Sequence, residues 1–165
     1  MTEPRASRPH LPADYGVPKS TKGLLAWSDA RARLEGALNY WVSTVSPEGT
    51  PHAVPVWGAW VDDRWYFDGS PETKHIRNVM KNPAASLHLE DGSEAVIVEG
   101  RVDAIQKPPR ALAEAVATAY REKYKAYGYA PDPDQWDGGG LYGLTPQKAL
   151  FWTSFPKDMT RFTFR

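Results

Sequence analysis

The chain of 165 residues contains no cysteine, carries no net charge and has no apolar run long enough to cross a bilayer. The absence of cysteine excludes disulfides, thiolate metal sites, a cysteine nucleophile and an iron–sulfur cluster. Twenty basic side chains balance twenty acidic ones, so no charge excess points to nucleic acid or an anionic membrane as a partner. A membrane span needs about 20 apolar residues, and residues 1–20 contain no apolar signal core. We expect a soluble, cytoplasmic domain.

The sequence also lacks the common motifs of metal and acid–base chemistry. Its histidines are not spaced as metal ligands, and there is no GxSxG motif, Walker loop or GxGxxG fingerprint. Most aspartates lie in turn-like sequence, where this residue is common. We therefore predict no metal site and assign no catalytic residue.

Aromatic residues, in contrast, are abundant: seven Trp, eight Tyr and five Phe. A core of this size does not need so many for filling. Aromatic side chains in such numbers are typical of a subunit interface or of a site for a flat ligand.

The chain divides into an arm and one folded domain. Residues 1–20 hold several prolines and few large apolar residues, which predicts an extended or disordered arm. Residues 21–165 have the length of a single domain. This domain should open with a short helix capped by Ser28. Period-two patterns then predict a meander of three strands at 40–45, 52–61 and 65–67.

The remaining pattern also favours a mainly β fold. Helices are expected from Ser70 to Asn82 and from 108 to about 127, and further strands at 85–90, 95–104, 150–153 and 160–164. Gly100 predicts a bulge in its strand, and the glycines and prolines of 128–140 predict a mobile loop. About six to seven antiparallel strands with peripheral helices indicate a β-barrel.

The helix expected after Ser70 collects groups that suit a phosphate. Ser70 is the expected N-cap, and Thr73 adds a hydroxyl in the first turn. Lys74, Arg77 and Asn78 share one face, because residues three and four apart on a helix lie side by side. A helix N-terminus with such cations can bind a phosphate mono- or diester. Taken alone, the spacing fits an ordinary capped helix with a solvated basic face better.

The strand around Pro55 is the second candidate. Proline cannot donate to a sheet ladder, so Pro55 predicts an edge, a bulge or a break in pairing. Main-chain groups left free beside Trp57 could meet the edge of a planar heterocycle. Taken alone, Trp57 fits a residue of the barrel core better.

Three segments resemble the flavin-binding split-barrel superfamily, which contains the pyridoxamine-phosphate-oxidase-like proteins and their deazaflavin-dependent relatives. They read STVSPEGTPHAVPVW at 43–57, YFDGSPETKHIRN at 66–78 and NPAASL at 82–87. The resemblance covers roughly residues 24–105. It implies a split β-barrel that forms a homodimer, with two flavin-type cofactors, coenzyme F420 (a deazaflavin) or FMN, at the dimer seam.

The resemblance also implies which residues bind the cofactor. In this family the helix-start residues hold the cofactor phosphate, and these match Ser70, Thr73, Lys74, Arg77 and Asn78. The family strand that lines the isoalloxazine ring matches Val54, Pro55, Val56 and Trp57. Trp152 matches more loosely, as a wall of the pocket supplied by the partner chain.

One departure from the family bears on the substrate. Pyridoxamine phosphate oxidases end in a segment with an Arg and a His that hold the substrate, whereas residues 159–165 contain Arg161 and Arg165 but no His. This argues against vitamin oxidation. The chain is more similar to the deazaflavin branch, whose members reduce unsaturated or conjugated substrates such as tetrapyrroles. FMN remains an alternative, because both cofactors share the ring system and a phosphate.

The resulting hypothesis is an oxidoreductase that transfers a hydride to or from a small conjugated organic substrate. The cofactor would carry the chemistry, so the absence of a visible nucleophile is expected, and solvent or one side chain would supply the proton. The alternatives are a non-catalytic protein that stores or senses the cofactor or a planar ligand, and an aromatic-rich dimer without a ligand. Tyr120, Tyr124 and Tyr127 precede a segment containing Trp136, which is either a lid over the substrate or an ordinary packed helix and surface loop.

Overall fold

The computed structural model describes residues 3–165. In this part of the chain nine strands form one antiparallel sheet: β1 (Arg5–Ser7), β2 (Tyr40–Val45), β3 (Pro51–Val56), β4 (Ala59–Val61), β5 (Arg64–Asp68), β6 (Ala84–His88), β7 (Val96–Ile105), β8 (Leu141–Phe151) and β9 (Thr160–Thr163). The helices are α1 (Trp27–Gly36), α2 (Lys74–Lys81) and α3 (Arg110–Tyr124), with 3-10 turns η1 (Ala13–Tyr15), η2 (Lys125–Tyr127) and η3 (Pro133–Trp136).

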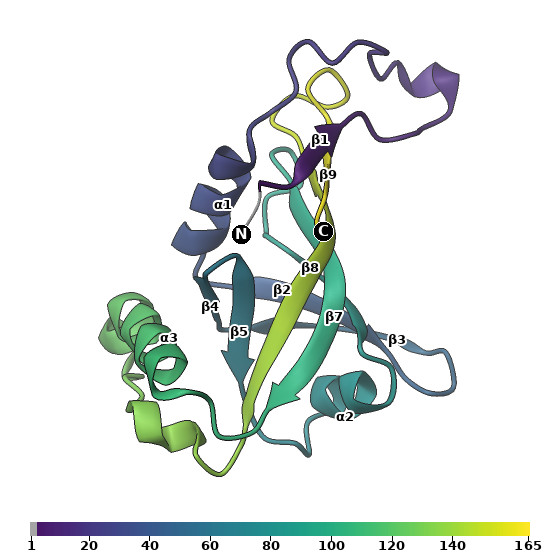
Figure 1. The fold of residues 1–165 in the computed structure, drawn as a ribbon. Coiled ribbons are helices and arrows are strands. Elements are labelled where there is room, and N and C mark those ends of the chain that lie inside the picture. The colour runs from purple at the N-terminus through teal and green to yellow at the C-terminus, as the bar shows by residue number, and fades with distance from the viewer. Residues whose placement is uncertain (1–2) are drawn as a thin grey trace.

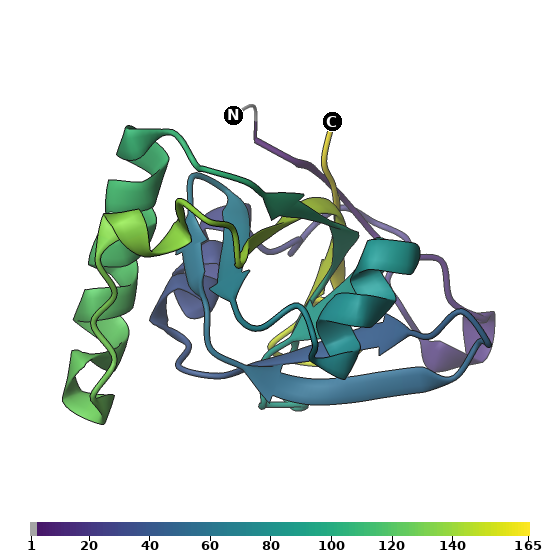
Figure 2. The ribbon, with the colours of Figure 1, turned by 90° about the horizontal axis from the view of Figure 1, so that it is seen from below.

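The sheet curls around a core but does not close. Its main path runs β1-β9-β8-β7-β6-β2-β3, and the β4–β5 hairpin joins it through β8. The long strands β7 and β8 pair side by side and run along most of the length of the molecule (Figure 1). Helix α2 packs on β2 and β3, whereas α3 packs on β4 at the opposite side (Figure 2). The mainly β split barrel with peripheral helices expected from the sequence is confirmed. In residues 3–165 no helix has both the length and the apolar character needed to cross a lipid bilayer.

Aromatic side chains dominate two separate cores. The barrel core is centred on Tyr40, Trp65 and Phe67, which are fully buried. A second cluster lies under α3 and contains Tyr120 and Trp136. Full burial of a large apolar side chain stabilises a protein by about 1.5–3 kcal/mol, so the aromatic residues account for much of the stability of both cores.

The bulge predicted at Gly100 is confirmed. The register between β7 and β8 shifts between Glu99 and Gly100. A Cβ atom at Gly100 would lie 2.2 Å from the backbone oxygen of Thr145, so only glycine fits this close approach. Pro146 faces Gly100 across the ladder, where its missing N–H is tolerated because pairing is already disturbed.

The single strand predicted for 52–61 is wrong, because the strand is interrupted at Trp57 and Gly58. The segment before the break is β3, which pairs with β2; the segment after it is β4, which pairs only with β5. A Cβ atom at Gly58 would lie 2.4 Å from Nε1 of the buried Trp65. Both predicted antiparallel pairs form, β2 with β3 and β4 with β5, but the three strands are not one continuous meander, because the middle strand is split and the β4–β5 hairpin joins the sheet through β8.

Three further boundaries differ from expectation. Helix α1 begins at Trp27 after Ala26, with no side-chain cap, so Ser28 is not its N-cap. Strand β8 begins at Leu141 and not near 150. The sequence did not predict its first part because a glycine and a proline interrupt the strand pattern there. That glycine, Gly143, packs against the guanidinium of Arg64. The segment 128–140, expected as a mobile loop, contains η3 with a buried tryptophan.

We predict that Gly58→Ala destabilises the fold by about 1–3 kcal/mol or more, because the added methyl overlaps a buried indole that has no room to move. Urea unfolding measures this change. Gly36→Ala is the control: no atom lies within 4 Å of a Cβ atom there, and alanine is a better helix former. Equal unfolding free energies for the two variants would contradict the close packing at Gly58.

Candidate functional site

Two clefts lie near the two ends of the edge strand β3. One, of about 450 Å³, lies between α2 and the turn that precedes β3; we call it the basic cleft, and it is lined by Ser46, Pro47, Glu48, Pro71, Lys74, Arg77, Asn78, Met80 and Lys81. The other, of about 510 Å³, lies where β3 ends; we call it the aromatic cleft, and it is lined by Val56, Trp57, Asp68, Gly69, Tyr129, Gln135, Trp136, Gly139 and Gly140.

The basic cleft contains cations without acidic partners. Lys74 and Arg77 are exposed on α2, and within residues 3–165 neither is among the side chains that form an ion pair. Glu48 lies on the other side of the cleft, and its pKa is lowered chiefly by a hydrogen bond with Ser46, with a smaller contribution from the charge of Lys74. The cleft therefore has cations available for an anionic ligand.

The start of α2 differs from the prediction. Thr73, not Ser70, is the N-cap residue, and the helix begins at Lys74. The Ser70 hydroxyl accepts a hydrogen bond from the Glu72 amide at 3.2 Å, and the Thr73 hydroxyl donates to the Ser70 carbonyl at 2.9 Å. Both hydroxyls thus bond within the preceding turn, because a short polar side chain easily finds a local backbone partner. Neither residue lines the basic cleft.

Asn78 contributes to the cleft in a different way from the cations. It is buried, and its Nδ2 donates to the Thr44 hydroxyl on β2 at 3.0 Å. This bond between two buried polar groups fixes α2 on the sheet. Asn78 therefore positions the helix that presents Lys74 and Arg77.

The structure separates the residues of β3 that the sequence singled out. Pro55 is exposed on β3, which within residues 3–165 pairs only with β2, so of the three predicted alternatives, an edge, a bulge or a break in pairing, the edge is the one observed at Pro55. Val56 and Trp57 line the aromatic cleft, whereas Val54 and Pro55 line neither cleft.

Trp57 is not a barrel core residue. It is 37% exposed and stacks on Tyr124, with ring centroids 4.6 Å apart and planes inclined by 11°. Its ring thus has one neighbour in near-parallel contact and the space of the aromatic cleft beside it. An indole held this way offers a flat apolar surface to a planar ligand.

Helix α3 satisfies the backbone at the break in the strand. Tyr124 Oη accepts from the Gly58 amide at 3.0 Å and lies 2.9 Å from the Gly58 carbonyl and 2.7 Å from the Leu38 carbonyl, either of which its proton can reach. Tyr120 Oη donates to the Trp57 carbonyl at 3.2 Å. Burial raises the pKa of Tyr124 to about 12, so this hydroxyl stays protonated at neutral pH.

A lysine lies beside the same break. Lys123 Nζ donates to the Ala37 carbonyl at 3.0 Å and to Tyr40 Oη at 2.6 Å, and it lies 5.0 Å from the centroid of the Tyr40 ring. Burial lowers the pKa of Lys123 to about 8, because a partly desolvated ammonium is costly.

The aromatic cleft contains a carboxylate that sequence reasoning missed. Asp68, the last residue of β5, accepts hydrogen bonds from Tyr129 Oη, from Gln135 Nε2 at 3.0 Å and from Trp136 Nε1 at 3.3 Å. Burial, followed by the hydrogen bond to Asp68, raises the pKa of Tyr129 to about 12. Nothing in the sequence links Asp68 to donors more than sixty positions away, and only its place at the end of a strand could have drawn notice.

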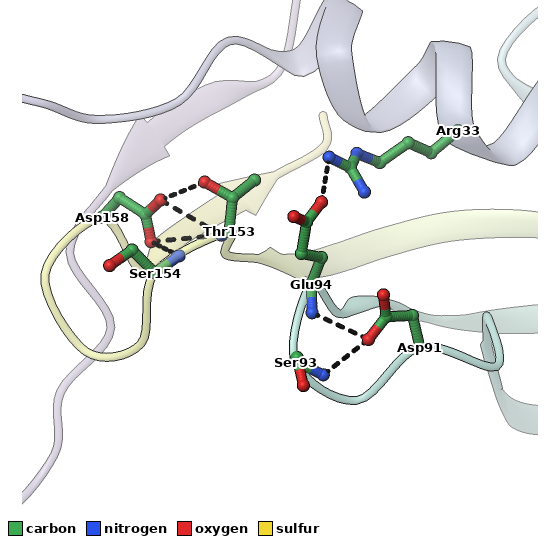
Figure 3. Close-up of polar contacts among 7 residues, drawn as sticks. All are labelled: Arg33, Asp91, Ser93, Glu94, Thr153, Ser154 and Asp158. Atoms are coloured by element: carbon green, nitrogen blue, oxygen red, sulfur yellow. Dashed lines mark hydrogen bonds and ion pairs between the residues drawn. The ribbon is translucent and has the colours of Figure 1, made fainter.

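Trp152 lines neither cleft of its own chain. Asp68, in the aromatic cleft, pairs with Leu141 at one end of β8, and Trp152 follows the other end. At about 3.3 Å per residue the strand separates them by roughly 30 Å. The adjoining loop is braced by Asp158, which accepts bonds from Thr153 and Ser154 (Figure 3).

Comparison with known proteins places the chain among split barrels. The family model described as pyridoxamine 5'-phosphate oxidase matches residues 27–153. No curated protein matches the sequence. The solved structures that resemble it include one titled F420 reductase, with 23% identity over 72% of this chain and 94% of that one and a TM-score of 0.54.

Two other similar structures are named for heme. A heme-binding protein from Mycobacterium smegmatis is 17% identical over 84% of this chain and 58% of that one, with a TM-score of 0.64. The heme storage protein HutZ from Vibrio cholerae is 15% identical over 73% of this chain and 87% of that one, with a TM-score of 0.54. At these identities the likeness concerns the fold.

We predict that Lys123 makes stability depend on pH. The pKa of Lys123 is lower in the folded protein than in the unfolded chain. The free energy of unfolding therefore rises with pH between about pH 8 and the ordinary lysine pKa, where the folded protein has lost this proton and the unfolded chain still holds it. From pH 7.5 to 9.5 the free energy of unfolding of the wild type should increase by about 1–2 kcal/mol relative to that of Lys123→Met, as measured by urea unfolding. The exposed Lys125→Met is the control. A difference that stays constant over this range would contradict the burial of a charged amine.

Proposed function

Because the chain belongs to the pyridoxamine 5'-phosphate oxidase family, as the match over residues 27–153 shows, we propose that it binds a flavin-type cofactor, coenzyme F420 or FMN. In this proposal it works as an oxidoreductase on a small conjugated organic substrate. The observation that carries the proposal is a pair of cations, Lys74 and Arg77, that form no ion pair within residues 3–165 and lie in a cleft beside the edge strand β3.

The basic cleft fits the phosphate of such a cofactor. An ammonium and a guanidinium one turn apart can both donate to phosphate oxygens, and charge-assisted bonds of this kind are the strong ones. Lys74 is the first residue of α2 and Arg77 follows one turn later, so both lie near the helix N-terminus, where the helix dipole also favours a negative charge. Asn78 holds this helix on β2, so the cations are presented by an anchored element. Ser70 and Thr73 supply the turn that leads into the helix.

Strand β3 fits the ring of the cofactor. Among the strands of residues 3–165 it pairs only with β2, so the main-chain groups on its other side are available to the edge of a heterocycle. Val54 and Val56 are half-buried along the strand, and Trp57 adds a flat surface at its end. When bound, a reduced flavin or deazaflavin ring supplies a hydride. The contribution of this chain is to bind the phosphate, orient the ring along β3 and keep water from it.

Dimerisation would complete the site. Trp57, Met80 and Tyr127 are large apolar side chains left exposed near the clefts, at 37%, 57% and 60%. Trp152 can act as a pocket wall only if it comes from a second copy, because it lines neither cleft of its own chain. A homodimer that covers these side chains would bury on the order of 2,000 Å².

The proposed substrate is not pyridoxamine phosphate. Trp57, Tyr129 and Trp136 at the aromatic cleft suit a flat conjugated molecule, and the residues that line this cleft include no lysine or arginine to hold a substrate phosphate.

A second candidate function is non-catalytic binding of the cofactor or of a planar ligand such as heme. The two structures named for heme binding and heme storage favour it. The residues that line the aromatic cleft include Tyr129 but neither histidine nor cysteine, which gives heme iron few familiar ligands. Titration with hemin, FMN and F420, followed by turnover of the reduced cofactor with added acceptors, separates the two functions: storage predicts binding without turnover.

We predict that Lys74→Ala weakens cofactor binding about 10- to 100-fold, because a charge-assisted contact contributes about 1.5–3 kcal/mol. Lys74→Ala together with Arg77→Ala should abolish measurable binding by isothermal titration. Neither cation belongs to the buried face of α2, so the double variant should fold normally and sediment as the same dimer as the wild type.

Two companion variants sharpen this test. Glu48→Gln removes the negative charge from the basic cleft and should tighten binding by a few fold, opposite in sign to Lys74→Ala. Arg101→Ala removes an exposed cation that lines neither cleft and should change nothing. Undiminished affinity of the double variant for both FMN and F420 would place the phosphate elsewhere.

A further inference from the structure

The aromatic cleft holds a carboxylate whose charge the fold leaves unbalanced. The three hydrogen bonds to Asp68, from Tyr129, Gln135 and Trp136, all end on Oδ2. Within residues 3–165 no side chain is found donating to Oδ1, and no lysine, arginine or histidine forms an ion pair with this carboxylate.

This pattern differs from that of the acidic side chains that pair with an arginine. Glu94 pairs with Arg33 at 2.5 Å (Figure 3), and Asp103 pairs with Arg64. At Asp68 the partners are a phenol, an amide and an indole. These neutral donors fix the position of the carboxylate but do not cancel its charge. A half-buried carboxylate between aromatic rings attracts a cation or a polarised N–H more strongly than one in open water.

The walls of the cleft suit a flat molecule. Trp57 stacks on Tyr124 and borders the cleft, and Tyr129 and Trp136 line it as well. Gly139 and Gly140 have φ values of 99° and 88°, which L side chains rarely adopt, so this wall is bare backbone. The volume of about 510 Å³ lies within the range of pockets for small ligands.

We propose that the aromatic cleft binds the acceptor of the reaction, as a planar nitrogen heterocycle that presents a cationic or N–H edge to Asp68. The binding follows from the cleft itself; the role as acceptor rests on the proposed function. The pyrimidine ring of a flavin-type cofactor also carries an N–H, so the same carboxylate could meet the cofactor in place of the acceptor. The experiment has to distinguish these two sources of one chemistry.

A matched pair of probes tests the binding. 9-Aminoacridine is a flat cation at neutral pH, and 9-anthracenecarboxylate is an anion with the same three-ring outline. Fluorescence titration of the protein without cofactor should show the cation binding at least about tenfold more tightly. Asp68→Asn should weaken 9-aminoacridine about tenfold and leave the anion unchanged or tighter, because an asparagine oxygen still accepts from the three neutral donors.

Two further variants provide controls. Asp14→Asn removes an exposed acid from η1 and should leave both titrations unchanged. Trp57→Leu should weaken both probes alike, because stacking does not depend on the sign of the charge. Equal affinity of the wild type for both probes, or unchanged cation affinity in Asp68→Asn, overturns the proposal, and the first of these needs no variant to fold.

The affinity of Asp68→Asn for F420 and FMN separates the acceptor from the cofactor. On this proposal the affinity of Asp68→Asn for F420 and FMN equals the affinity of the wild type. A loss as large as the loss for 9-aminoacridine would mean that Asp68 meets the cofactor ring, which overturns the acceptor role. If cofactor binding survives the loss of both Lys74 and Arg77 while the probes still discriminate by charge, the phosphate assignment fails and the Asp68 cleft stands.

Discussion

The arrangement of this protein depends on one interruption, the break between β3 and β4 at Trp57 and Gly58. Broken pairing exposes amide and carbonyl groups, and leaving such groups buried without partners would be costly. Tyr120 and Tyr124 of α3 supply the partners from a helix more than sixty residues later. The break, the lack of a side chain at Gly58 and the docking of α3 are therefore one structural unit, in which each part requires the others.

The two clefts follow from this unit. Since β3 is released from the β4–β5 hairpin, it ends the main path of the sheet as an edge strand, with α2 packed beside its beginning. Its other end carries Trp57 onto Tyr124, where η3 and the end of β5 complete the aromatic cleft. In our proposals the basic cleft binds the cofactor phosphate, the cofactor ring lies along β3, and the aromatic cleft near the other end of the strand receives the acceptor.

Features that follow from local chemistry could be predicted from the sequence, and features that depend on distant contacts could not. Proline has no N–H, so Pro55 indicated an edge, and Gly100 indicated the bulge. The spacing of Lys74 and Arg77 placed both cations on one helix face and in one cleft. The cap at Ser70 was wrong because its hydroxyl found a partner inside a turn. Asp68 and the break at Gly58 were missed because their partners, Tyr129 and Trp65, become neighbours only through the fold.

The prolines of β3 have a consequence for the behaviour of the molecule in crowded solution. An exposed edge strand invites pairing with a strand of another molecule, which is a common route to aggregation. Main-chain groups along a strand point alternately to its two sides, and residues 51, 53 and 55 of β3 turn theirs away from β2, toward the open side. Pro51 and Pro55 have no N–H to offer there. Of these three positions only Ala53 keeps an amide on the open side. A foreign strand would find too few donors there for a continuous ladder, so this flank stays open to small molecules and closed to sheet extension.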